Sequence, residues 1–278
     1  MPPAAKRKPR SYDPARTWKA LNAQLAQVTS AARGLAAEDL AAPSGLPDWD
    51  VRLLLAHIVA QAEALPRALG EAPPPAARAQ VGLSQWALSA AGESVRLDQD
   101  TRAEAVRIAG EFGGDAVAAL DAAAERLAAC EAEVLRPGRL VPCALGAMTA
   151  SDYAVTRVVE LVVHADDLAR ATGADVPHDR QALAATVRVL ADALAVKAPG
   201  ASVEVRIPPY AVVQCVEGPR HTRGTPPNVV ETDPLTWLRL ATGRTAWAEA
   251  REAARVSASG DRADIGGLLP VGSGIPAP

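Results

Sequence analysis

The sequence has little of what several large classes of protein depend on. Aromatic residues make up only 3% of the 278 residues, too few for a surface that stacks nucleic-acid bases. The net charge is −3, so the sequence also lacks the excess positive charge with which proteins bind nucleic-acid phosphates. It contains no run of the roughly 18 consecutive apolar residues that a membrane-spanning helix needs. We therefore expect neither a nucleic-acid partner nor a membrane span.

Cysteine is scarce as well, and so is any sign of export. Cys130, Cys143 and Cys215 are scattered and form no CxxC pair, so we interpret them as buried or incidental thiols in a reducing compartment. The basic, proline-containing residues 1–10 are not followed by the apolar segment of a secretion signal. We expect a cytoplasmic protein.

Three common site signatures are missing too. The sequence contains no GxGxxG, no Walker A motif and no GxSxG nucleophile elbow. Ser259-Gly260-Asp261 is better interpreted as a turn at the end of a strand than as a catalytic serine.

The rest of the composition is that of a folded protein. Hydrophobic residues make up 49% and charged residues 22% of the chain, and its length favours two domains. We predict a disordered basic tail, a helical domain, a small α+β domain and a flexible tail, over residues 1–12, 13–173, 174–270 and 271–278.

Capping signals and apolar periodicity predict long helices in the first domain. Asp13-Pro14 is a typical helix start, with an accepting side chain followed by a proline in the first turn. Pro66 is expected to kink the second helix or end it early. The helices are expected near residues 13–34, 48–70, 77–91, 101–135 and 149–173, and the stretch 101–135 could be interrupted at Gly113-Gly114. Long helices joined by loops are typical of a four-helix bundle.

The pattern changes after Gly173. Residues 202–207 and part of 211–216 alternate between apolar and polar side chains, which predicts strands of a sheet with one solvent-facing side. Asp233-Pro234 repeats the signal for a helix start, and Gly243 would end that helix. Further elements are expected at residues 181–197 and 246–254, as helices, and at 255–260, as a strand.

Histidine is rare, and the positions of two of the four histidines are informative. Glu160 and His164 are four residues apart on the strongest predicted helix, so they share one face of it. His57 lies in the second helix among apolar residues. If these helices face each other, two imidazoles and a carboxylate form a three-ligand set with an open position, as in catalytic Zn²⁺ sites, although Fe²⁺ or Ni²⁺ would also suit it. The alternatives are a weak exposed ion pair and a core histidine.

Three other polar residues could also belong to a site. Asp167 follows His164 by three residues and could hydrogen-bond the second nitrogen of a ligand, or be an ordinary surface acid. His178 and His221 lie in segments rich in proline and glycine, where a solvated side chain is expected.

Two segments resemble the signatures of the mycothiol-dependent maleylpyruvate isomerase family. Residues 46–57, LPDWDVRLLLAH, resemble its tryptophan and Arg-x-x-x-x-His motif, and residues 157–168, RVVELVVHADDL, resemble its Glu-x-x-x-His motif. The resemblance implies a DinB-like four-helix bundle in which His57, Glu160 and His164 bind a divalent metal, usually Zn²⁺. Residues 233–244 and 256–264 look like the sterol-carrier-like α+β domain of such proteins, some of which are called sterol carrier family proteins.

The resemblance, which covers roughly residues 15–270, also implies a chemistry. The open metal position would receive the thiol of mycothiol, and the resulting thiolate would attack a small electrophilic substrate, as in an isomerase or an S-transferase. Such isomerases hold an anionic substrate with arginines, for which Arg206, Arg239 and Arg244 are all candidates here. Neither catalytic nor cofactor-binding residues are assigned.

Two other functions remain open on the sequence alone. The α+β domain could enclose a lipid or sterol, which would make the chain a carrier with a structural or relic metal site. The chain could also be a regulatory or scaffolding protein that keeps the site as a relic. For the enzyme we expect a small-molecule substrate and a low-molecular-weight thiol as partners, and a monomer or a homodimer.

Overall fold

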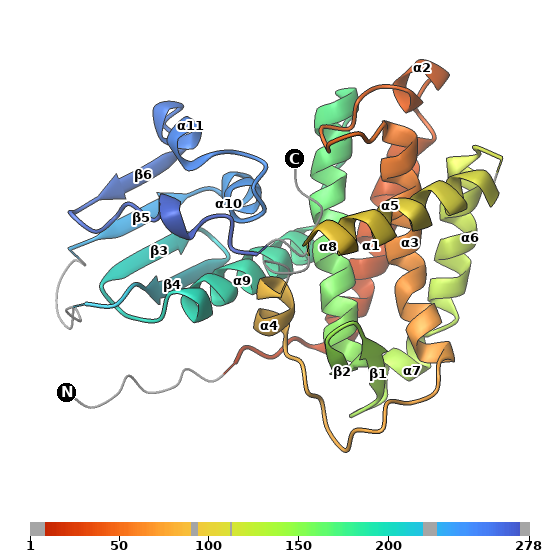
Figure 1. Cartoon of the computed structure of the whole chain (residues 1–278), viewed down its shortest axis with the longest axis horizontal. Coiled ribbons are helices and arrows are strands. Elements are labelled where there is room, and N and C mark those ends of the chain that lie inside the picture. Colours follow the sequence, from red (N-terminus) through yellow and green to blue (C-terminus); the bar gives the residue numbers. More distant parts are fainter. Residues whose placement is uncertain (1–8, 90–93, 112, 219–226, 273–278) are drawn as a thin grey trace.

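The structure, a computed structural model, describes residues 9–89, 94–111, 113–218 and 227–272. Figure 1 shows a helical part, coloured red to green, beside a part that contains a four-stranded sheet, coloured teal to blue. The order of helices first and a small sheet-containing domain second confirms the predicted fold class.

The helical part is a four-helix bundle. Its helices are α1 (Pro14–Ala32), α3 (Val51–Gly70), α6 (Ala116–Ala128) and α8 (Ala150–Thr172). Each of α1 and α3 contacts both α6 and α8, and leucines from all four helices are fully buried between them. Three further helices, α2 (Ala37–Leu40), α5 (Ser94–Glu111) and α7 (Glu131–Leu135), surround the bundle, and α5 contacts α3.

The helix ends follow the local signals. Asp13 accepts the backbone N–H of Arg16 and Pro14 is the first residue of α1, as predicted. The side chain of Thr149 caps α8, and Gly173 ends it with a φ of +70°, a backbone conformation that glycine adopts without strain. Asp50 caps α3 through the N–H of Leu53.

One predicted helix differs from the structure because distant contacts override local preference. Residues 77–82 are not helical, since the N–H groups of Gln80 and Val81 donate to the carbonyl oxygen of Ala147 at 2.8 and 3.1 Å. Within residues 77–89, the described part of the predicted stretch, α4 (Leu83–Leu88) is the one helix. Ala147, which accepts from Gln80 and Val81, belongs to a hairpin of β1 (Leu140–Cys143) and β2 (Gly146–Thr149). This hairpin is not among the elements predicted from the sequence. The stretch 101–135 is divided among α5, α6 and α7, and α5 and α6 lie on either side of Gly113-Gly114, where an interruption is expected and where both glycines have a positive φ.

Of the two effects expected of Pro66, an early end of α3 is wrong. The helix continues through Pro66 to Gly70. Leu65 and Ala68, on either side of the proline, are buried, so packing holds the last turn in place.

The second part is an α+β domain. Its sheet has the strand order β4-β3-β5-β6, with β3 (Val203–Ile207) antiparallel to β4 (Ala211–Cys215) and parallel to β5 (Val229–Thr232), and β5 antiparallel to β6 (Val256–Ser259). Side chains of β3 and β4 alternate between buried and more exposed, which confirms the predicted solvent-facing side. The helical elements are α9 (Arg180–Lys197), α10 (Pro234–Ala241), α11 (Trp247–Glu252) and the 3-10 turn η1 (Gly266–Leu268).

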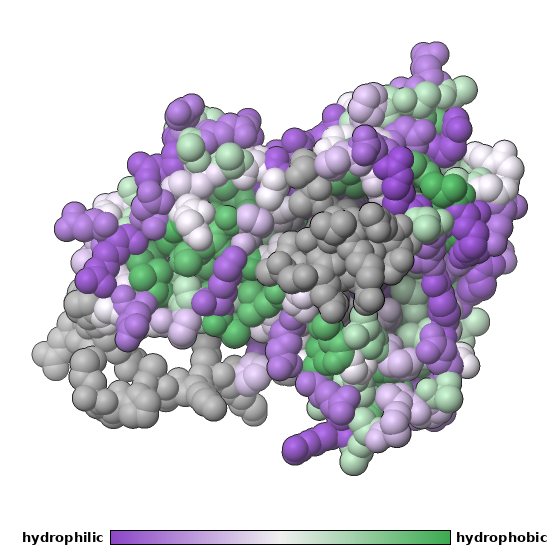
Figure 2. Space-filling model, viewed as in Figure 1, coloured by the Kyte–Doolittle hydropathy of each residue, from purple (hydrophilic) through white to green (hydrophobic). Residues whose placement is uncertain are grey.

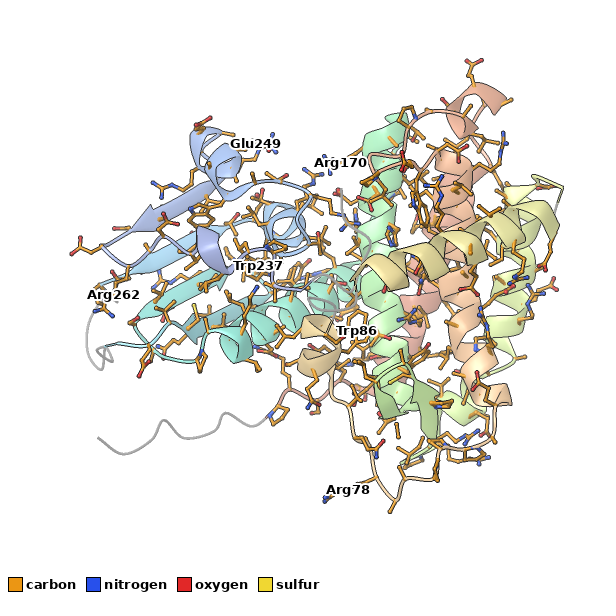
Figure 3. All side chains as sticks on the ribbon, viewed as in Figure 1. Arg78, Trp86, Arg170, Trp237, Glu249 and Arg262 are labelled. Carbon is orange, nitrogen blue, oxygen red and sulfur yellow. The ribbon has the colours of Figure 1, made fainter. Side chains whose placement is uncertain are left out.

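Buried apolar side chains form the interior of this domain. Trp237 of α10 is only 1% exposed, and Figure 3 shows it among the elements of the domain. Figure 2 shows hydrophobic residues gathered over the same domain, while hydrophilic residues surround much of the rim of the molecule. Among the helices of the described residues, none has both the length and the apolar character that crossing a membrane requires.

Helix α9 joins the two parts. It contacts α1, α4 and α8 on one side and β4 and α10 on the other. Trp86, on α4, is partly buried at this junction (Figure 3). Ahead of the bundle, Arg10 donates to Asp192 of α9 at 2.7 Å.

The predicted terminal tails fall mostly outside the described residues. The described residues begin at 9 and end at 272, so residues 1–8 and 273–278 of the two predicted tails lie outside them. Near the second boundary, Val271 is buried and donates its N–H to Ala241 at 2.9 Å.

The start of α10 allows a test of one cap. Asp233 Oδ1 accepts the N–H groups of Leu235 and Thr236 at 3.0 Å each, and Oδ2 accepts the Thr236 hydroxyl at 2.6 Å. We expect Asp233→Ala to lower the free energy of unfolding by about 1 kcal/mol in a urea titration. Asp233→Asn, which keeps an accepting oxygen, should cost clearly less.

The contribution of Asp233 should also depend on pH. Burial acts to raise the pKa of this carboxyl, but its hydrogen bonds to Thr236 and Leu235 outweigh burial and lower the pKa below the usual value. The ionised form is therefore stabilised on folding: its contribution is complete above the unfolded-state pKa of about 3.9 and is lost as the pH falls through the lower folded-state pKa. A difference in stability between the unmodified protein and the Asp233→Asn variant that stayed constant from pH 7 to pH 2 would contradict this assignment.

Candidate metal centre

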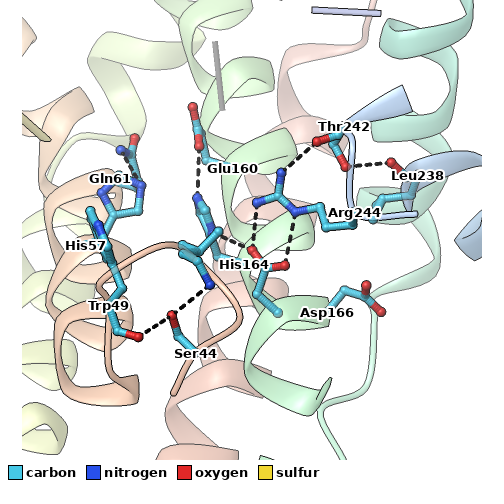
Figure 4. A network of polar contacts seen from close by, with 12 residues as sticks. Ser44, Trp49, His57, Gln61, Glu160, His164, Asp166, Leu238, Thr242 and Arg244 are labelled. Carbon is cyan, nitrogen blue, oxygen red and sulfur yellow. Dashed lines mark hydrogen bonds and ion pairs between the residues drawn. The ribbon is translucent and has the colours of Figure 1, made fainter. Parts of the chain in front are cut away.

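The structure brings His57, Glu160 and His164 together inside the bundle. His57 comes from α3 and the other two residues from α8, and their exposed fractions are 1%, 3% and 0%. One ring nitrogen of each histidine and one carboxylate oxygen lie within 4.8 Å of one another. Figure 4 shows the three side chains directed toward one another between the two helices. The alternative of an exposed ion pair between Glu160 and His164 is wrong, because both are buried.

Ring packing fixes the orientation of His57. Its imidazole meets that of His164 edge to face, with centroids 4.7 Å apart and planes at 90°. The indole of Trp49 meets the same imidazole at 5.5 Å and 86°. Ser44 donates its hydroxyl to the Trp49 carbonyl at 3.0 Å and so holds the loop before α3 against the site.

The donor set fits a divalent metal. Among the described residues, Glu160 Oε2 and His164 Nε2 are two of the few buried polar side-chain atoms without a hydrogen-bond partner, and they lie 3.4 Å apart without the alignment of a hydrogen bond. Buried polar groups are rarely left in this state unless a ligand, ion or water completes them. Two imidazole nitrogens and a carboxylate oxygen, with a position left open, match a catalytic zinc site.

The histidines are electrostatically different. Burial, reinforced by the neighbouring His164, lowers the pKa of His57 well below its usual value, so its ring is neutral and can act as a ligand. Burial acts in the same direction on His164, but the facing carboxylates of Asp167 and Glu160 outweigh it and raise the pKa of His164. A pocket that favours a proton on His164 is one in which a positive charge is stabilised.

Asp167 is a buried partner of His164. Its Oδ2 lies 2.9 Å from His164 Nδ1, so the interpretation as a surface acid is wrong. Burial acts to raise the pKa of Asp167, but the guanidinium of Arg244 and the contact with His164 outweigh it and hold the pKa well below its usual range. Asp167 is therefore ionised and fixes a proton on His164 Nδ1, which leaves Nε2 to face Glu160.

Sequence reasoning missed two residues of the site, Gln61 and Arg157. Arg157 is buried, donates to Gln61 Oε1 and lies 3.9 Å from Glu160. Because arginine can only donate, the amide nitrogen of Gln61 must face His57 Nε2, which lies 3.1 Å from it and accepts. The available signal was spacing, since Gln61 follows His57 by four residues and Arg157 precedes Glu160 by three.

Two of the three arginines considered as anion binders reach the bundle. Arg239 donates to both oxygens of Asp166, at 2.9 and 2.6 Å, and Arg244 to both oxygens of Asp167, at 3.0 and 2.7 Å. Arg206 instead pairs with Glu204 on the sheet. The last turn of α10 and the residues that follow it are thus the face of the α+β domain that meets the metal-site helix.

The expectation of a solvated His178 is wrong. The ring of His178 is largely buried, its Nε2 has no hydrogen-bond partner among the described residues, and burial lowers its pKa. His221 lies outside the described residues.

Known proteins share both parts of the chain. The family model described as the mycothiol maleylpyruvate isomerase N-terminal domain matches residues 21–169, more than half of the chain, and the model described as a bacterial SCP ortholog matches residues 179–271. No curated protein sequence matches the chain.

Two solved structures share the fold. A mycothiol-dependent maleylpyruvate isomerase is 18% identical with a TM-score of 0.55, and a histidine-to-alanine mutant of such an isomerase is 17% identical with a TM-score of 0.54. Each alignment covers 89% of this chain and 93% of the other.

Proposed function

This chain belongs to the mycothiol maleylpyruvate isomerase family, and from that premise we propose that it is a divalent-metal-dependent enzyme that uses mycothiol as its thiol cofactor. The reaction would be an isomerisation, or an S-transfer, on a small electrophilic substrate. The observation that carries the proposal is the buried set of His57, Glu160 and His164, with two atoms that lack hydrogen-bond partners among the described residues.

These three residues would hold the metal, Zn²⁺ being the ion that suits them best. A bound divalent metal would lower the pKa of a thiol and so provide a thiolate nucleophile at neutral pH. The ring of His57 is neutral, which is the form that binds a metal; its Nε2 lone pair accepts from Gln61, so this amide would turn away when a metal binds. Asp167 keeps the Nδ1 proton of His164 in place. Arg157 holds the amide of Gln61 beside His57 and lies 3.9 Å from Glu160.

The surroundings of the set support chemistry in a dry site. Trp49 and the helices α3 and α8 exclude water from the three side chains, which strengthens every electrostatic interaction among them. Arg239 and Arg244 are each paired with an aspartate, so we assign neither of them to an anionic substrate.

The proposal predicts thiol-dependent turnover that requires the metal ligands. Purified protein loaded with Zn²⁺ should accelerate the reaction of mycothiol with maleylpyruvate or with a simple electrophile such as 1-chloro-2,4-dinitrobenzene. Chelation with 1,10-phenanthroline, or His164→Ala, should reduce the rate to that of the uncatalysed reaction, while His178→Ala should not. Turnover that survives both chelation and His164→Ala would refute the proposal.

The alternative of a lipid carrier is less well supported. The apolar side chains of this domain belong to one continuous buried core, in which Trp237 is only 1% exposed. The match to a bacterial SCP ortholog describes this domain's relatives and does not by itself require an apolar ligand.

A further inference from the structure

We propose that Arg244 is a positioning residue of the metal centre, through which the α+β domain holds the ligand His164 in place. The inference rests on the metal site proposed above and adds that metal binding and docking of the α+β domain are energetically coupled.

An unbroken chain of contacts joins the two domains at this point. His164 Nδ1 lies 2.9 Å from Asp167 Oδ2, and that carboxylate accepts from Arg244 Nη2 at 2.7 Å and, through Oδ1, from Arg244 Nε at 3.0 Å. Figure 4 shows the chain running from Glu160 through His164 to Arg244. Because these side chains are almost fully buried, water cannot replace a missing member.

Arg244 is itself fixed by the end of α10. Its Nη1 donates to the carbonyl of Thr242 at 3.0 Å, and the Thr242 hydroxyl donates to the carbonyl of Leu238 at 2.7 Å. The guanidinium therefore has one orientation relative to the α+β domain, and its planar fork imposes that orientation on the carboxylate of Asp167. The carboxylate in turn sets the rotation of the His164 ring, which decides whether Nε2 faces Glu160.

The neighbouring ion pair provides a matched comparison within the same interface. Asp166 and Arg239 form an equally close, bidentate ion pair between the same two domains. Arg239 Nε lies 2.9 Å from Asp166 Oδ2, and Arg239 Nη2 lies 2.6 Å from Asp166 Oδ1. Successive residues of an α-helix differ in direction by about 100° around its axis, so Asp166 and Asp167 lie on different faces of α8. Among the hydrogen bonds of the described residues, Asp166 is bonded to Arg239 and not to His164. Loss of either arginine weakens the interface, but only the loss of Arg244 releases His164.

The test is the Zn²⁺ dissociation constant of the full chain, measured by competition with a chromophoric chelator. Arg244→Ala is expected to raise this constant about 10–100-fold, as the loss of a partner that orients a metal ligand does in other sites. Arg239→Ala, which weakens the same interface without contacting Asp167, should raise it far less. Coupling is reciprocal, so saturating Zn²⁺ should raise the melting temperature of the unmodified protein more than that of Arg244→Ala.

Two milder variants cover the case in which Arg244→Ala does not fold. Arg244→Lys keeps a positive charge but lacks the planar guanidinium group, so it should give an intermediate Zn²⁺ dissociation constant. Asp167→Asn keeps the size of the side chain and should resemble Arg244→Ala. Equal constants for the Arg244 and Arg239 variants would overturn the inference while leaving the metal site intact. Absence of stoichiometric Zn²⁺ binding by the unmodified protein would overturn the metal site and this inference with it.

Discussion

Protein in which His57 is replaced by alanine is expected to retain almost no divalent metal. The unmodified chain, supplied with Zn²⁺ and then freed of excess ion, should contain close to one metal per chain. With His57→Ala, a carboxylate and one imidazole remain. The affinity should therefore fall by more than the roughly 10–100-fold that follows the loss of an outer partner of a ligand. Elemental analysis of both proteins after dialysis against a weak chelator measures the effect.

His178→Ala is the matched control for this prediction. It removes another largely buried imidazole with a lowered pKa, but one outside the ligand set. It should keep the metal content of the unmodified chain. Equal metal contents in the His57→Ala and unmodified proteins, or equal losses in both variants, would show that the ion is held elsewhere.

A large loss of stability is expected from Gly260→Ala. Gly260 follows β6 with a φ of +102°, and a Cβ at this position would overlap the carbonyl oxygen of Pro227 and press on the side chain of Asn228. Asn228 cannot easily yield, because it is buried, donates to the Ser202 carbonyl at 2.8 Å and accepts the N–H of Arg262 at 3.0 Å. Since backbone strain alone costs about 1–3 kcal/mol, we expect the free energy of unfolding to fall by about 3 kcal/mol or more.

Gly267→Ala provides the comparison for Gly260→Ala. A Cβ at Gly267 would meet no atom within 4 Å, so this variant should keep the stability of the unmodified chain. Urea titrations followed by tryptophan fluorescence would separate the two variants. Similar midpoints for both would mean that the turn after β6 relaxes, which contradicts the tight contact with Asn228.

Helix ends were the most predictable features, because their determinants lie within a few residues of each other. Asp13, Asp233 and Gly173 each act on neighbouring backbone groups, so a local sequence window contains the whole interaction. The pairing of Gln80 with Ala147 has no such local signal, and the segment around it was accordingly misjudged as helical.

The candidate site was predictable only in part for a similar reason. The spacing of Glu160 and His164 places them on one helix face, whereas the position of His57 beside them depends on how α3 packs on α8. Asp167 could be suggested from its distance to His164 in the sequence. Its partner Arg244, 77 residues further on, could not be chosen from three candidate arginines until the docking of the α+β domain was known.

The adjacent aspartates of α8 constrain how chains of this kind can change in length during evolution. Inserting one residue between His164 and Asp167 would rotate everything beyond it by about 100° and set both interdomain pairs out of phase with the ligand. The loop over residues 71–82 is largely exposed and not helical, so an insertion there would not rotate any residue of the site relative to another. Length variation among relatives is therefore expected in that loop, whereas the spacing from residue 160 to residue 167 should stay invariant wherever both domains are retained.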